Sequence, residues 1–253
     1  MHSTSTSGPL DLLLRKLQTH ARLDEEDCRA IAALPYVLKT LEPQSYTVRE
    51  GETPEVCAVL VSGFAYRQKL TGDGARQIVG LHIPGEALDL QNLFLQVSDH
   101  NVQMLTRAEL AMIPRPALQE LVRTRAAVAH AVMMVILVEA SIFREWVLNV
   151  GRRDASTRLA HLLCEFAVRL EAQGLANGDG FELPMTQEQL GDSLGLTPVH
   201  VNRTIKALES LGFVERDRRR IRFPDWERMR DFGDFTQRYL HIEPGLRQRA
   251  RGA

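Results

Sequence analysis

The stretch MTQEQLGDSLGLTPVHVNRTIKALESLGFVERDRRRIRF, residues 185–223, decides the architecture of this chain. Thr186 and Gln189 form a capping box, which predicts that a short helix begins there. After a turn, Pro198 occupies the first position of a second helix, 198–211, where a missing N–H costs nothing. Two helices joined by a three-residue turn are typical of a helix-turn-helix, and FVERDRRRIRF after them predicts a β-hairpin wing.

The exposed face of the second helix carries the side chains that read bases in a DNA major groove. The guanidinium fork of Arg203 matches the O6/N7 edge of guanine, Asn202 can pair with adenine, and Val199 can contact a thymine methyl. His200 lies on the same face. The residues expected to contact phosphate are Gln187, Thr197, Lys206, Arg216, Arg218, Arg219 and Arg220.

Alternative interpretations exist for each feature alone. The arginine run by itself suits a solvated turn, and Arg203 by itself suits a surface ion pair with Glu209 or another acid. Helix-turn-helix spacing, an outward-facing arginine and a basic wing together favour DNA.

Composition permits this function despite a formal net charge of −1. Residues 1–120 carry 11 basic and 15 acidic side chains, whereas residues 201–223 carry seven basic and three acidic ones. The basic charge is therefore concentrated where the DNA would lie. The 253 residues, 44% of them hydrophobic, suffice for two domains. Three scattered cysteines suit a reducing cytoplasm, and no disulfide framework is expected.

In the N-terminal half, the sequence pattern changes from helical to strand-like near residue 46. Residues 10–40 predict short helices, one of them capped by Asp24. From Tyr46 to Ile113, short apolar and β-branched runs alternate with Gly, Pro and Asp. The runs are YTV, CAVLV, FAYRQKL, RQIVGLHI, VQML and ELAMI. This even spacing predicts an antiparallel barrel or jelly roll.

A long helix is predicted from about Pro116 to Val150. An apolar seam with coiled-coil spacing predicts its contact with a second copy, and the opposite face is apolar as well. The seam comprises Val128, Ala131, Val135, Val138 and Ile142. An internal helix of a monomer is the alternative. The stretch 126–143 is apolar enough to suggest a membrane span, but Glu139 inside it argues for a soluble protein.

These motifs resemble the cyclic-AMP-receptor/FNR superfamily of transcription regulators. The winged helix of 185–223, the roll punctuated by Gly51, Gly63 and Pro84-Gly85, the long helix and DASTRLA (154–160) all match. The resemblance implies an α+β fold with an N-terminal β-roll (jelly-roll) sensor domain, a long dimerisation helix and a C-terminal winged helix-turn-helix domain. We expect the boundaries 1–9 (disordered tail), 10–116 (β-roll), 117–150 (dimerisation helix) and 151–253 (DNA-binding domain with a C-terminal extension).

The effector pocket departs from the family pattern. The positions that hold the ribose and cyclic phosphate in cyclic-AMP receptors correspond to Leu90, His100 and Asn101, with Asp99 beside them. The adenine-reading pair corresponds to Phe143 and Arg144. A phosphate site without arginine and with a carboxylate nearby is electrostatically poor. The cysteine cluster of the iron–sulfur branch and the Cys/His ligands of the haem branch are also missing from the sequence, so we expect no cofactor and no metal.

The sequence therefore predicts a cytoplasmic homodimeric regulator, with no catalytic residues, that binds a palindromic DNA site. RNA polymerase is a further candidate partner, and the sensor input is left open. Two alternatives remain. The winged helix could recognise protein within a ligand- or protein-binding dimer, or the chain could be a constitutive regulator without a small-molecule effector.

Overall fold

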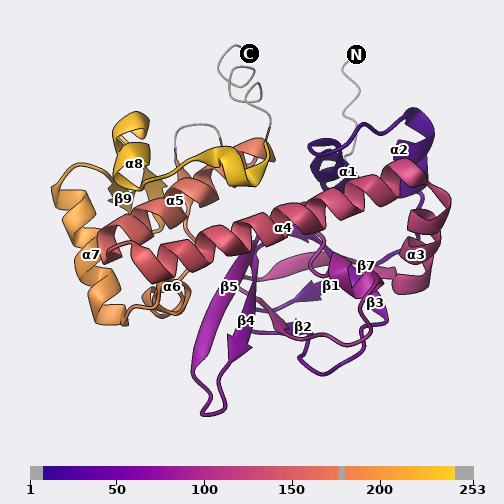
Figure 1. Ribbon diagram of the computed structural model, residues 1–253, viewed down its shortest axis with the longest axis horizontal. Helices are drawn as coiled ribbons and strands as arrows, with labels where there is room; N and C mark the ends of the chain where they lie inside the picture. The colour runs from indigo at the N-terminus through magenta and orange to yellow at the C-terminus, as the bar shows by residue number, and fades with distance from the viewer. Residues whose placement is uncertain (1–7, 177–179, 243–253) are drawn as a thin grey trace. The chain divides into compact units, whose positions relative to one another are not determined.

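The computed structural model describes residues 8–176 and 180–242, and Figure 1 labels its helices and strands. Contacts divide the chain into two compact units. The first unit runs to Ala65 and resumes over His82–Leu137, and the second contains Tyr66–Leu81 and the chain from Val138. Strands, a long helix and a helix-turn-helix occur in the expected order, which confirms the α+β fold class. The disordered tail expected at 1–9 lies, up to residue 7, outside the described residues.

Two short helices open the first unit, as the sequence predicts. Helix α1 spans Asp11–Gln18, and α2 spans Glu25–Ala32. Asp24 caps α2: its carboxylate accepts from the backbone N–H of Asp27 at 2.8 Å, and the Asp27 carboxylate accepts from the N–H of Asp24. Such a cap stabilises a helix by about 1 kcal/mol.

The strands of the first unit form antiparallel sheets. Strand β7 (Ala108–Pro114) lies between β1 (Val37–Leu41) and β3 (Val56–Ser62). Strand β2 (Tyr46–Val48) pairs with β6 (Asn101–Met104). Four of the predicted runs, YTV, CAVLV, VQML and ELAMI, are thus strands of this unit, but β1 was not predicted. Four of its five residues are exposed, so it lacks the alternation by which a half-buried strand is recognised.

Two apolar cores support these sheets. One lies among α1, α2, β3, β7 and the first turns of the long helix, and includes Leu17, Ile31 and Ile113. The other includes Leu60, Met104 and Leu110 and lies between strands. The 3-10 helix η1 (Leu90–Leu93) contributes Leu90 and Leu93 to the first core.

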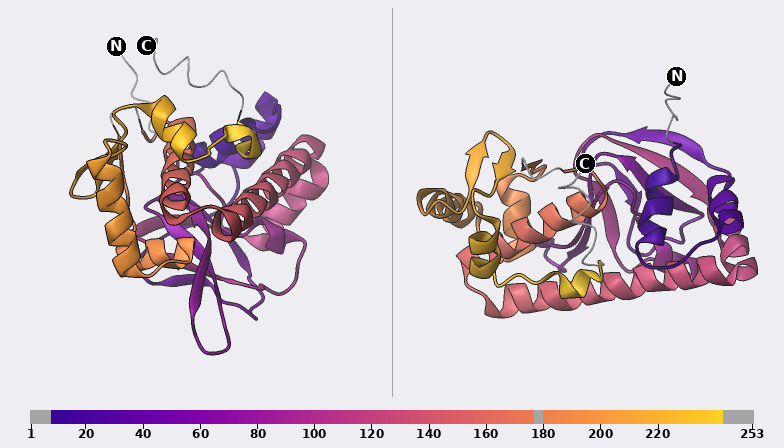
Figure 2. Two further views of the ribbon diagram at one scale, coloured as in Figure 1. Left: turned by 60° about the vertical axis from the view of Figure 1, so that its left-hand side comes forward. Right: turned by 90° about the horizontal axis from the view of Figure 1, so that it is seen from above.

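The predicted long helix is two helices. Helix α3 spans Arg115–Thr124 and α4 spans Ala126–Arg152, the latter drawn from three directions in Figures 1 and 2. Arg125 between them is extended, with φ −123° and ψ 103°. Its guanidinium donates to the buried carboxylate of Asp27 at 3.2 Å.

By length and composition alone, α4 could cross a membrane. Glu139 within it is paired, however: Arg67 Nη1 lies 3.5 Å from Glu139 Oε2. Val128, Ala131 and Val135 pack in the core of the first unit. The first part of α4 is therefore a core helix of the first unit.

The second unit contains the helix-turn-helix and wing. Helix α5 spans Ala155–Ala172 and is capped by Asp154, so only Arg153 and Asp154 separate it from α4. The expected hinge at 149–154 is shorter than predicted because α4 continues to Arg152. The remaining elements are β8 (Phe181–Glu182), α6 (Gln187–Leu194), α7 (Pro198–Ser210), β9 (Glu215–Asp217), β10 (Arg220–Arg222), α8 (Trp226–Phe232) and η2 (Gln237–Leu240). Of the predicted turn NGDGF, residues 177–179 lie outside the described residues.

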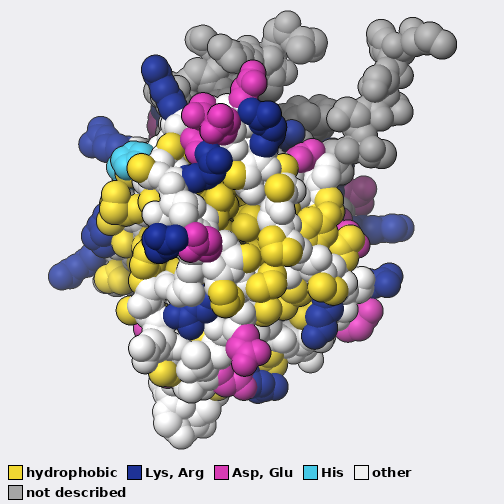
Figure 3. All heavy atoms as spheres, turned by 90° about the vertical axis from the view of Figure 1, so that its right-hand side faces the viewer, with side chains coloured by type: hydrophobic (Ala, Val, Ile, Leu, Met, Phe, Trp, Pro, Cys, Tyr) yellow, Lys and Arg dark blue, Asp and Glu magenta, His cyan; other side chains and the backbone are white. Residues whose placement is uncertain are grey.

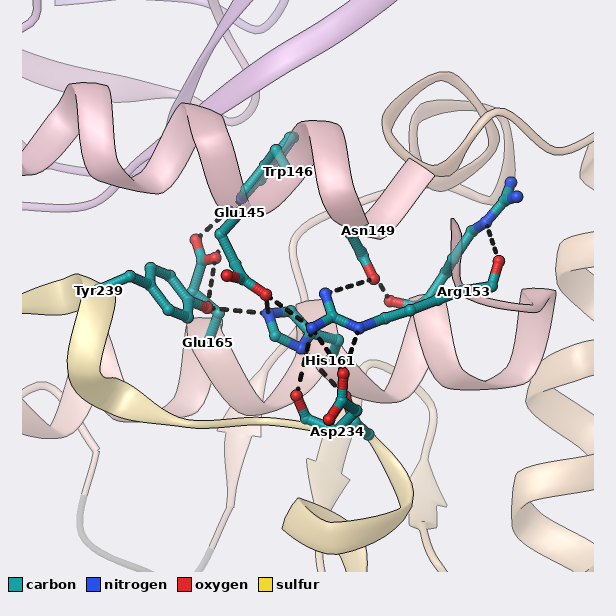
Figure 4. Close-up of polar contacts among 10 residues, drawn as sticks. Glu145, Trp146, Asn149, Arg153, His161, Glu165, Asp234 and Tyr239 are labelled. Atoms are coloured by element: carbon teal, nitrogen blue, oxygen red, sulfur yellow. Dashed lines mark hydrogen bonds and ion pairs between the residues drawn. The ribbon is translucent and has the colours of Figure 1, made fainter. Parts of the chain in front are cut away.

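A buried polar cluster ties the C-terminal segment to α4 and α5 (Figure 4). The Glu165 carboxylate accepts from the Trp146 indole N–H at 3.0 Å, from Arg169 at 3.1 Å and from the Tyr239 hydroxyl at 2.9 Å. Glu165 is only 1% exposed. Its charge is therefore compensated by donors from three separate segments.

His161 completes this cluster. Its Nδ1 lies 3.0 Å from the Gly233 carbonyl oxygen, so Nδ1 carries the proton, and Nε2 lies 3.0 Å from the Tyr239 hydroxyl. Burial, and then the charge of Arg153, lower the pKa of His161 below its usual 6.5. The neutral imidazole is therefore the form that the fold favours.

Acidification is expected to destabilise the second unit through His161. Because the unfolded chain takes up this proton near pH 6.5 and the folded chain only at lower pH, the stabilisation is present above 6.5 and is lost as pH falls below it. Thermal unfolding between pH 7.5 and 5 should show a steeper loss of Tm for wild type than for His161→Gln. Parallel profiles would contradict the assignment.

Candidate nucleic-acid interface

Helix α7 is built as the sequence predicts. The Thr197 hydroxyl accepts from the His200 backbone N–H at 3.3 Å, and Pro198 occupies the first turn. Val201, Ile205 and Leu208 are buried, which fixes the rotation of the helix about its axis. The helix ends at Ser210, one residue before the predicted end.

The opposite face of α7 is open to solvent. Val199 is 81% exposed, and Arg203 and Lys206 are exposed as well. With Gln187, Pro198 and Asn202, these side chains line one open groove. Arg203 forms no ion pair or hydrogen bond within the described part of the chain. A solvated guanidinium on the exposed face of a helix is available to an external acceptor.

The wing is a β-hairpin in which β10 pairs with both β8 and β9. Arg218 at its turn has φ 54°, a left-handed conformation that costs a non-glycine residue about 1 kcal/mol. Arg218, Arg219 and Arg220 are exposed. Arg216 instead pairs with Glu209 of α7 at 2.8 Å, so the acid considered as a partner for Arg203 is held by Arg216.

The turn between α6 and α7 requires glycine at two positions. Gly195 ends α6 with φ 64°. A Cβ on Gly191 would lie 2.4 Å from the Leu196 carbonyl oxygen, closer than atoms can approach. Gly191 lies inside helix α6, where glycine is usually unfavourable. A glycine within a helical pattern is therefore the signal in the sequence for this close approach.

Gly191→Ala should destabilise the protein by about 1–3 kcal/mol and weaken DNA binding, because the added methyl forces α6 and the turn apart. Gly151→Ala is the matched control: it also adds a methyl in a helix, but nothing lies within 4 Å. There we expect stabilisation of about 0.5–1 kcal/mol. Urea unfolding of both variants checks this, and equal stabilities would contradict the close approach.

The polar residues expected at the effector pocket of the roll, His100 and Asn101, form hydrogen bonds within the protein. His100 is buried, its Nδ1 lying 2.6 Å from Asp99 and its Nε2 2.9 Å from Asp89. Asn101 is also buried, and its side-chain oxygen accepts from the Glu50 backbone N–H at 3.1 Å. The contact of Asp89 with His100 was not predicted. A carboxylate within the otherwise apolar run ALDL was the signal in the sequence that could have indicated a buried polar partner.

The other candidate residues are distributed separately. Leu90 belongs to the apolar core of the first unit. Phe143 and Arg144 lie on α4 in the second unit, where the Arg67 guanidinium is 5.8 Å from the Phe143 ring centre and Arg144 is exposed. Among the described residues, no group of three His, Cys, Asp or Glu could hold a metal.

The predicted dimer seam faces the interior of its own chain. Val128 and Ala131 are fully buried, and Val135 and Val138 are 6% and 4% exposed, so they offer almost no surface to a second copy. Ile142 is half-buried. The exposed apolar residues of α4 are Met133, Leu137, Val147 and Leu148. Their spacing of four and ten to eleven residues places them on one face of the helix, away from the buried seam.

Exposed apolar side chains also occur away from α4. Figure 3 shows hydrophobic side chains of all types gathered across the middle of one face, with charged groups around them. In the first unit the exposed apolar side chains include Val37 and Leu38 on β1 and Phe94, Leu95 and Val97 after η1.

Comparison with known proteins identifies both parts of the chain. Residues 38–125 match the family model of the cyclic nucleotide-binding domain, and residues 157–232 match that of the Crp-like helix-turn-helix domain. The solved structure of FixK2 from Bradyrhizobium japonicum has the same fold, with a TM-score of 0.74 and 24% identity. The match covers 80% of this chain and all of FixK2.

Two curated relatives extend over most of the chain. The nitrogen fixation regulation protein FixK of Rhizobium meliloti is 30% identical over 190 residues, 74% of this chain and 82% of FixK. The transcriptional activator protein FnrL of Cereibacter sphaeroides is 28% identical over 207 residues, 81% of this chain and 82% of FnrL.

Proposed function

The chain belongs to the Crp/Fnr family of transcription regulators, and from that premise we propose that it is a homodimer whose two α7 helices read a palindromic DNA site. The observation that carries the proposal is the solvated Arg203 on the exposed face of a capped helix beside an arginine-rich wing. Two-fold symmetry of the dimer places the helices about one DNA turn apart.

Four side chains of α7 are assigned to bases. Arg203 contacts guanine, Asn202 adenine and Val199 a thymine methyl, with His200 beside them. Gln187, Thr197, Lys206 and the wing arginines contact phosphates, although Thr197 and Arg216 already serve as a helix cap and an ion-pair partner. A winged helix that recognised only protein would not need this concentration of cations.

The dimer contact is assigned to the exposed apolar face of α4. Met133, Leu137, Val147 and Leu148 form an apolar stripe that a second copy can cover symmetrically. This replaces the seam of Val128, Ala131, Val135 and Val138. The interior face then anchors α4 while the exposed face joins the subunits.

The sensor input is not a cyclic nucleotide, haem or an iron–sulfur cluster in this proposal. Two carboxylates flank His100 where a cyclic phosphate would need a cation. Cys57 and Cys164 are buried, and Cys28 is half-buried. In this proposal the roll is either a scaffold for the dimer or a sensor of a different input. The protein acts in the cytoplasm and catalyses no reaction of its own. Activation through RNA polymerase is inferred from relatives such as FnrL.

Arg203→Ala should lower affinity for the preferred site by about 1–3 kcal/mol and relax one position per half-site, because a base contact is lost. Lys206→Ala should weaken binding to all sequences and reduce the salt slope by about one, because a phosphate contact is lost. Selection from random duplex DNA, followed by salt titrations, measures both. Selection of no palindrome by the wild-type protein would contradict the proposed function, and unaltered readout by Arg203→Ala would contradict the base assignment.

Leu137→Asp should convert the dimer into monomers and abolish binding to a palindrome, because two carboxylates would face each other in an apolar contact. Leu38→Asp is the matched control, since Leu137 and Leu38 are 53% and 46% exposed. Analytical ultracentrifugation gives the mass of each variant. A dimeric Leu137→Asp would place the contact elsewhere.

A further inference from the structure

The hairpin of β4 (Ala65–Leu70) and β5 (Arg76–His82) lies within the sequence that matches the cyclic nucleotide-binding domain. In the structure, Tyr66–Leu81 nevertheless belongs to the same compact unit as the helix-turn-helix. Polar contacts hold the hairpin to two helices of that unit.

Arg76 at the start of β5 forms ion pairs with two residues of α6. Its Nε donates to Asp192 Oδ2 at 2.6 Å, and Nη2 lies 3.5 Å from Glu188 Oε1, one helical turn earlier. The side chains of Arg76 and Asp192 are 25% and 24% exposed, so bulk water screens this pair only partly. Arg76 thus spans one face of α6.

Gln77, the next residue, caps the same helix. Its side-chain amide donates to the Asp192 carbonyl at 2.6 Å. From α5, Arg158 donates to the Leu194 carbonyl at 3.0 Å. The last carbonyls of a helix have no partner within the helix, so donors placed there fix where it ends. The end of α6 is therefore held by β5 and α5 together.

The far end of β5 is attached to α5. The buried Arg169 donates to the Leu81 carbonyl at 2.6 Å and to Glu165 at 3.1 Å. Glu165 belongs to the buried cluster of Figure 4. Strand β5 is thus fastened at both ends, to α6 by Arg76 and to α5 by Arg169.

These contacts leave the DNA-reading face uncovered. Val199 stays 81% exposed and Arg203 stays exposed on α7 while Arg76 holds α6. Only Gly195–Thr197 separate α6 from α7, so the orientation of α6 determines that of α7. The hairpin can therefore support binding without blocking it.

We propose that the β4–β5 hairpin positions α6, and through it the recognition helix α7, with Arg76 and Gln77 as positioning residues for DNA readout. The inference rests on the proposed function, since it concerns the same DNA site. An input that displaces the hairpin would then alter DNA affinity without touching α7.

Charge reversal with rescue tests the contact. Arg76→Asp should lower affinity for the selected palindrome about 3- to 10-fold, because repulsion replaces an attraction with Asp192. The swap Arg76→Asp/Asp192→Arg keeps the wild-type net charge and should recover most of the loss. Arg107→Asp, at a side chain 73% exposed in the first unit, controls for the change in charge and should bind within about twofold of wild type.

Hydrogen exchange gives a second readout that does not depend on DNA. Arg76→Asp and Gln77→Ala should speed amide exchange in α6, the swap should restore it, and circular dichroism should report folded protein throughout. If the Arg107→Asp and Arg76→Asp variants bind DNA equally well, or the swap recovers neither affinity nor exchange, the positioning role is overturned. If the swap returns amide exchange in α6 to the wild-type rate but the wild-type protein binds no DNA, the proposed function alone is rejected.

Discussion

The buried carboxylate of Glu165 is the interaction on which the second unit depends. It accepts hydrogen bonds from α4 through Trp146, from α5 through Arg169 and from the C-terminal segment through Tyr239. Arg169 also holds the end of β5. A buried carboxylate needs hydrogen-bond donors around it, so the segments that carry Trp146, Arg169 and Tyr239 have to meet in one arrangement.

This constraint gives the C-terminal segment a structural role. Asp234 lies 2.9 Å from Arg153, at the junction of α4 and α5, and Tyr239 closes the cluster around His161. The junction is only two residues long, so these contacts restrain the place where the long helix turns into the DNA-binding module. Residues after the wing thereby hold the junction between α4 and α5.

Helix α4 is subject to a second constraint, because both of its faces are apolar. The face of Val128, Ala131 and Val135 is buried in the first unit, and the face of Met133 and Leu137 is exposed. Periodicity alone predicts the two faces but not which one a core will cover, since that depends on strands and helices brought in from elsewhere in the chain. The ion pair between Arg125 and Asp27 likewise joins residues that are distant in sequence.

Local sequence determined the helix-turn-helix, the wing, most strands and the exposed Arg203 face, because caps, turns and periodicity act over only a few residues. Strand β1 was missed because it is an exposed edge without alternation. The tertiary structure decided the face of α4 that remains free, the pairing of Arg216 with Glu209, the enclosure of His100 by Asp89 and Asp99, and the attachment of the β4–β5 hairpin to α6. These outcomes depend on contacts between side chains that are distant in the sequence, and short-range sequence patterns do not predict such contacts.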